Sequence, residues 1–154
     1  MSAEQPTAAE RIAAALAKRE QLKTSEADAR AEQYAVDLEA LVDLEGEHGF
    51  DRIVRVDVGV WQPGKGAATM VVAKAPRGSE KVFKRFEEKI AKAKKDGSTA
   101  VLDAHHELAI SCLVYPSDKK LLDATLDIAP GLLSHVANEI VKAVQGSAED
   151  EKKG

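Results

Sequence analysis

The hydrophobic period of the chain changes from that of a helix to that of a strand after Asp51, and this change constrains the fold most. Arg55 and Asp57 lie on one face of the new pattern, and valines fill the other. These valines are Val54, Val56, Val58 and Val60. A period of two predicts a half-buried strand. A second β-rich run at 69–75 follows the turn-forming segment 63–66, so the two runs predict an antiparallel hairpin with a loop longer than two residues. Two strands alone are marginally stable, so we expect the hairpin to pack on helices or to pair with another chain.

A helical segment is predicted over residues 1–50, before the hairpin. Thr7 and Glu10 have the spacing of a capping box, and the alanine-rich run at 8–23 has high helix propensity. Only a few side chains in this run are larger than alanine. We therefore expect a weakly packed helix that needs a partner.

A second capping signal follows at Ser25 and Asp28. The residues after it repeat apolar side chains at helical spacing, which predicts a separate amphipathic helix. Gly46 or Gly49 is expected to end it, because glycine readily adopts the left-handed conformation of a helix C-terminus.

Helical patterns also dominate the rest of the chain. They run from Ser79 to Gly97, from Ser98 or Thr99 through Leu113, from a cap at Ser117 to the Pro130-Gly131 break, and from Leu132 to Gly146. The predicted fold class is therefore α+β, mainly helical with one antiparallel β-hairpin. We expect a hairpin-plus-helical domain over 51–146 and a disordered polar tail over 147–154.

Composition excludes several classes of protein. The chain has 154 residues and a formal net charge of −4. No apolar stretch is long enough for a membrane span, and no export signal is visible, so we expect no membrane association and a cytoplasmic location. The single cysteine, Cys112, cannot form an internal disulfide.

The charge is distributed unevenly along the chain. Residues 1–50 carry 5 basic and 11 acidic side chains, residues 51–100 carry 12 and 6, and residues 101–154 carry 5 and 9. A basic block between acidic flanks is compatible with self-association as a homo-oligomer. It favours nucleic-acid binding less than a uniformly basic domain would, so no nucleic acid is expected.

The residue types that support catalysis are present, but their spacing does not suit it. His105 and His106 are adjacent, so their side chains point about 100° apart on a helix and cannot both bind one metal ion. Cys112 occupies an apolar helical position typical of a core cysteine, and Ser111 lacks the glycines of a nucleophile elbow. The Gly64-Lys65-Gly66 turn lacks the Walker pattern. We expect neither an enzyme nor a bound metal or cofactor.

The best candidate for a binding surface is the basic face of the predicted helix near residues 81–95. Its cations are Lys81, Lys84, Arg85, Lys92 and Lys95. One interpretation is an ordinary solvated face, since the pairs Glu80–Lys84 and Glu88–Lys92 have helix-stabilising spacing. The other is a docking surface for an acidic protein segment. Trp61 is a further candidate, either as a cover for the hairpin end or as an anchor for another chain.

Residues 52–146 resemble the tail assembly chaperones of long-tailed phages. The resemblance rests on Ala75-Pro76, on Phe83-Lys84-Arg85-Phe86, on Val114-Tyr115-Pro116-Ser117 and on the Pro130-Gly131-Leu132 break. It implies a non-enzymatic chaperone in the cytoplasm of an infected bacterium that binds the tape measure protein and helps tail tube subunits to assemble around it. The alternative is a generic protein-interaction module, such as a structural virion or scaffold component.

Members of this family are often made in a short and a long form by programmed ribosomal frameshifting. The resemblance therefore directs attention to Glu151-Lys152-Lys153, which the codons GAA AAA AAG can encode. That sequence contains a slippery heptamer.

Overall fold

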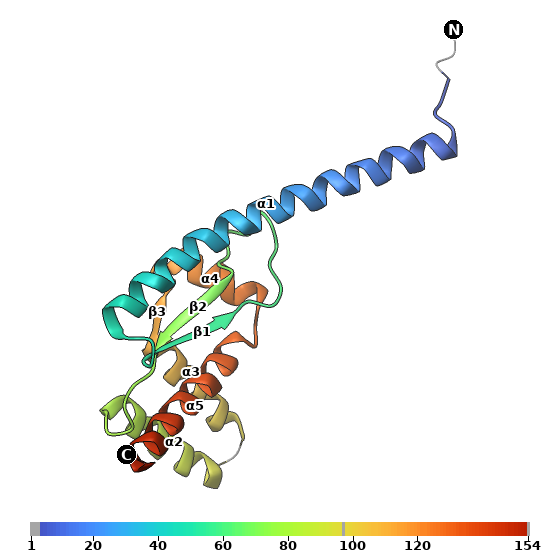
Figure 1. Cartoon of the computed structure of the whole chain (residues 1–154). Helices are drawn as coiled ribbons and strands as arrows, with labels where there is room; N and C mark the ends of the chain where they lie inside the picture. Colours follow the sequence, from blue (N-terminus) through green and yellow to red (C-terminus); the bar gives the residue numbers. More distant parts are fainter. Residues whose placement is uncertain (1–3, 97, 154) are drawn as a thin grey trace.

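The computed structural model describes residues 4–96 and 98–153. Its elements, in chain order, are α1 (Ala8–His48), β1 (Ile53–Asp57), β2 (Met70–Lys74), α2 (Lys81–Asp96), α3 (Ser98–Cys112), β3 (Leu113–Tyr115), α4 (Lys119–Ile128) and α5 (Leu132–Lys153). The fold is α+β and mainly helical, as predicted (Figure 1). No helix within these described ranges is long and apolar enough to cross a membrane.

The predicted antiparallel hairpin is confirmed, and it belongs to a larger sheet. The strand order is β1-β2-β3, so β2 lies in the centre, and its register with β1 pairs Val56 with Val71. The third strand was not predicted, because the sequence pattern favoured a helix through Leu113. Instead β3 pairs antiparallel with β2, with Tyr115 opposite Val72. Pro116 disfavours helical geometry at Tyr115, and the extended segment before it completes the sheet.

Helices cover both faces of this sheet (Figure 1). Successive side chains of β2 point to opposite faces, so Met70 and Val72 pack with Leu41 of α1. Val71 and Ala73 pack into a larger core on the other face. The helical members of this core come from α2, α3 and α5 and include Phe83, Phe86, Leu108, Ala109, Val136 and Ile140. The requirement that the hairpin pack on helices is thus met within the chain.

One helix, α1, runs through Ala8–His48, where two helices were predicted. Thr7 caps it as predicted, because its hydroxyl accepts the backbone N–H of Glu10 at 3.2 Å. Ser25 and Asp28 do not interrupt α1, since a capping side chain starts a helix only where backbone N–H groups are free. The helix passes Gly46 and ends at Gly49, which has a φ of 92° and donates its N–H to the Glu45 carbonyl.

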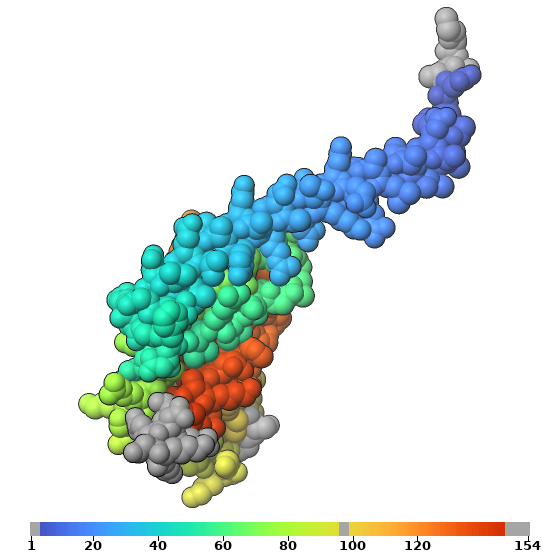
Figure 2. Space-filling model, viewed as in Figure 1, coloured from blue at the N-terminus to red at the C-terminus, as the bar shows by residue number. Residues whose placement is uncertain are grey.

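Half of α1 projects beyond the sheet as an arm, which we define as residues 8–28. Every described residue from 4 to 28 is exposed, whereas the helix from residue 29 onward packs on the sheet. The arm extends away from the rest of the molecule in Figures 1 and 2. The packed half of α1 therefore belongs to the same folded unit as the hairpin and the later helices, and the expected boundary at residue 50 does not separate two packed units.

Two helix boundaries in the C-terminal half differ from the prediction. Asp118, not Ser117, caps α4, and its carboxylate accepts the N–H of Lys120 at 2.9 Å. The last helix, α5, continues past Gly146 to Lys153, over most of the segment that was expected to be a disordered tail. Helix propensity explains this continuation, because a single glycine costs only about 1 kcal/mol in a helix interior.

A fully buried carboxylate, Asp37, joins α1 to β3 and to the residue just before β2. Thr69 donates its N–H and its hydroxyl to Asp37 Oδ2, each at 2.6 Å. Gln33 donates to Oδ1 at 2.9 Å, and the Tyr115 hydroxyl also donates to Oδ1. Burial, followed by this bond to Asp37, raises the pKa of Tyr115. The phenol therefore stays protonated and keeps its donor role.

Replacing Asp37 with alanine should destabilise the fold strongly. Asp37→Ala leaves the buried donors of Thr69 and Tyr115 without their acceptor, and we expect a loss of about 3 kcal/mol in the free energy of unfolding. Urea unfolding followed by Trp61 fluorescence measures this loss. Asp43→Ala removes an exposed carboxylate from the same helix and should change stability by less than about 0.5 kcal/mol. Equal effects of the two variants would contradict the assigned role of Asp37.

Candidate functional site

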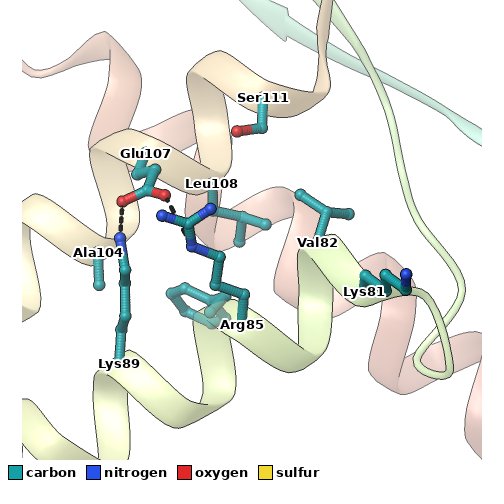
Figure 3. Close-up of a pocket in the computed structure, with 9 residues that line it drawn as sticks. Lys81, Val82, Arg85, Lys89, Ala104, Glu107, Leu108 and Ser111 are labelled. Atoms are coloured by element: carbon teal, nitrogen blue, oxygen red, sulfur yellow. Dashed lines mark hydrogen bonds and ion pairs between the residues drawn. The ribbon is translucent and has the colours of Figure 1, made fainter.

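A groove lies between α2 and α3, with an apolar floor and a charged rim (Figure 3). Its volume is about 200 Å³. The floor is formed by Val82, Phe86, Ala104 and Leu108, and the rim by Lys81, Arg85, Lys89, Glu107 and Ser111. This combination suits a ligand that presents an apolar side chain next to an acidic one.

One carboxylate of the rim, Glu107, pairs with two of its three cations. Glu107 of α3 accepts a hydrogen bond from the Lys89 ammonium and lies 3.4 Å from Arg85 Nε (Figure 3). These neighbours, Lys89 foremost, lower the pKa of Glu107, so it is ionised at neutral pH. The rim still carries three cations against this one anion. A second carboxylate entering the groove therefore meets a net positive surface.

The predicted basic face of α2 is confirmed as an exposed surface. Its five cations, Lys81, Lys84, Arg85, Lys92 and Lys95, are all exposed, whereas Phe83, Phe86 and Ala93 are buried on the opposite side. The structure brings Lys81 and Arg85 to the groove and leaves the other three outside its lining. Lys89 and Glu107 were not predicted from the sequence. Lys89 could have been found, because it lies four residues after Arg85 and therefore on the same helix face. Glu107 lies on another helix, and no local sequence pattern indicates it.

Trp61 does not belong to this site. It lies in the β1–β2 connection, and α2 lies at the other end of the molecule in Figure 1. Its indole N–H donates to the Ala67 carbonyl at 2.8 Å, and the side chain is half-buried. These contacts favour the first of the two interpretations, a cover for the hairpin end.

The adjacent histidines bind different neighbours. His105 Nδ1 donates to the Val101 carbonyl at 2.8 Å, and its ring packs edge-on against Phe86. His106 Nε2 lies 3.2 Å from Ser134 Oγ. Over residues 4–96 and 98–153, no three His, Cys, Asp or Glu side chains are grouped closely enough to hold a metal ion.

Comparisons with models of protein families, with curated proteins and with solved structures find no match to this chain.

Cys112 is buried in the core, and desolvation raises the pKa of its thiol to about 11. The thiolate is the reactive form, so at pH 8 the folded protein has about a hundredfold less of it than an unperturbed cysteine. We expect a disulfide reagent such as Ellman's reagent to label the native protein at least a hundredfold more slowly than the urea-unfolded protein. The labelling rate of the native protein should rise as the pH approaches 11. Equal rates for native and unfolded protein would show that Cys112 is accessible.

Proposed function

We propose that this chain is a non-enzymatic tail assembly chaperone of a long-tailed phage. In this proposal it binds the tape measure protein in the cytoplasm of the infected bacterium and helps to recruit tail tube subunits around it. The groove between α2 and α3, together with the basic face of α2, forms the client-binding surface. The observation that carries the proposal is the apolar floor bordered by cations on a single helix pair.

The proposed client has chemistry that fits this surface. A long helical protein exposes apolar stripes that need cover until assembly buries them. One apolar side chain of such a helix would enter the groove over Phe86 and Leu108, and acidic side chains beside it would pair with the exposed cations of α2. Matching charges of opposite sign orients the client and speeds its association.

Within the groove, Glu107 pairs with Arg85 and Lys89, and a client carboxylate can take its place. Before a client binds, the Glu107 carboxylate pairs with Arg85 and Lys89 and offsets part of their positive charge. Exposed ion pairs contribute little to stability, so a carboxylate of the client can replace Glu107 without a large penalty.

Reversing the charge of the basic face should abolish client capture. We expect Lys84→Glu/Arg85→Glu/Lys92→Glu to reduce co-purification of a co-expressed tape measure protein by more than about tenfold at low salt. Tag-based purification followed by quantitative mass spectrometry measures this reduction. Raising the salt concentration should also reduce capture of the client by the unmodified protein.

The matched control reverses the charge of three exposed lysines that lie outside α2. Lys65→Glu/Lys119→Glu/Lys120→Glu changes the net charge equally and should leave capture unchanged. Equal loss in both triple variants would show that net charge rather than the α2 surface decides binding. Full capture by the α2 variant would overturn the proposed site. Stable incorporation of the chain into purified phage particles would instead support a structural virion component.

A chaperone of this family is expected to have a longer form. Expression of the native gene with its downstream DNA and an N-terminal tag should give a minor larger product on an immunoblot. Mass spectrometry of that product should find a peptide that crosses Lys152-Lys153 into another reading frame. A single product of this length would remove the frameshift from the proposal.

A further inference from the structure

Within the described residues, the outer edge of β1 has no partner strand. The strand order β1-β2-β3 places β1 at an edge of the sheet, where it pairs with β2 on one side. Val58 follows β1 and donates its N–H to the Thr69 carbonyl at 2.9 Å, in continuation of the register of the two strands. Backbone groups alternate in direction along a strand, so the even-numbered residues of β1 point theirs towards β2. The outward groups belong to the odd-numbered residues, which are Ile53, Arg55 and Asp57.

This outer edge is open. α1 packs on one face of the sheet and α5 on the other, and β1 lies between them in Figure 1. Over residues 4–96 and 98–153, no backbone group of a turn or loop hydrogen-bonds to the outward groups of β1. Arg55 and Asp57 are exposed. An edge of this kind is a template for a further strand from another chain.

A groove borders the edge on the side of α1. Its volume is about 480 Å³. Tyr34 and the small residues Ala27 and Ala31 line it from α1, and Val58 and Gly59 line it from the segment after β1. Side chains of a strand added to β1 would point alternately towards α1 and towards α5. One side chain on the α1 side can therefore enter the groove, where the small residues leave room for it.

The charges of this groove favour an acidic ligand. Its lining includes two cations, Arg30 and Arg55, and one anion, Asp57. Arg55 Nε lies 2.8 Å from Asp57 Oδ1, and the guanidinium stacks 5.7 Å from the centre of the Tyr34 ring. Arg30 is exposed and makes the lining net positive. A carboxylate on an added strand is therefore attracted to the groove.

The position of α5 favours a single added strand over a second copy of the chain. Among the strands, α5 packs mainly on β1, and its Val136 and Ile140 share a core with Val56. The β1 strands of two joined copies would lie about 4.8 Å apart, whereas packed helices need about 8–10 Å. The two α5 helices would overlap below such a pair. The partner must therefore supply an extended segment with no helix beneath it.

We propose that the outer edge of β1 binds an extended acidic segment of a partner protein as a fourth strand of the sheet. The outward groups of Ile53, Arg55 and Asp57 pair with the backbone of this segment, while an apolar side chain enters the groove and a carboxylate meets Arg30. Backbone pairing supplies affinity, and the groove supplies specificity. This surface shares no residue with the α2–α3 groove and does not depend on the proposed function.

NMR titration of the full chain tests the pairing. The probe is a synthetic peptide with blocked ends, TLTETLTE, in which threonine alternates with leucine and glutamate. In the free protein, the outward amides of Arg55 and Asp57 should exchange with solvent faster than the inner amides of Val54 and Val56. The peptide should bind with a Kd below about 1 mM and move the outward amide signals downfield, because these groups gain hydrogen-bond partners. Nuclear Overhauser contacts should join the peptide backbone to β1. Binding at the α2–α3 groove instead, or no shift at about 5 mM peptide, would overturn the proposal.

Two variants test whether the peptide side chains use the groove. Ala31→Phe fills the groove and should weaken peptide binding by more than about fivefold, whereas Ala17→Phe is the matched control on the exposed arm and should leave binding unchanged. Arg30→Glu should also weaken binding, and it should bind a peptide with lysine in place of glutamate more tightly than the unmodified protein does. Equal binding of each peptide by all of these proteins would contradict the assigned groove.

Discussion

The buried carboxylate of Asp37 is the constraint on which the arrangement of this molecule depends. A polar group removed from water is tolerated only when hydrogen-bond partners satisfy it, and here Gln33, Thr69 and Tyr115 supply donors from three separate segments. The bonds fix where α1 lies along the sheet, since a shift by one turn would set an unpaired carboxylate against apolar side chains. Because α1 is one continuous helix, fixing its second half also fixes the direction of the arm.

Sequence patterns predicted those helices and strands whose own residues indicate their structure. Alternating valines marked β1, and Thr7 marked the start of α1. They did not predict β3, because a three-residue strand is defined by its pairing with β2 rather than by its own sequence. The capping signal at Ser25 suggested a break that α1 does not have. Asp37 carried a usable signal, since an acid at position 37 interrupts an otherwise apolar helix face between Tyr34 and Leu41.

The candidate site was predictable only in part, for a similar reason. The basic face of α2 follows from helical spacing, and its five predicted cations are exposed, but Lys89 of the same helix was not predicted. The groove beside it depends on how α3 packs, and Glu107 reaches Arg85 and Lys89 across that interface.

Hydrogen exchange of the full chain with and without the tape measure protein tests whether the client binds at α2 and α3. Binding slows exchange where it suppresses local opening. We expect slower exchange at backbone amides of α2 and α3 in the complex, with α4 unchanged. Slower exchange confined to the sheet or to α4, with α2 and α3 unaffected, would contradict it.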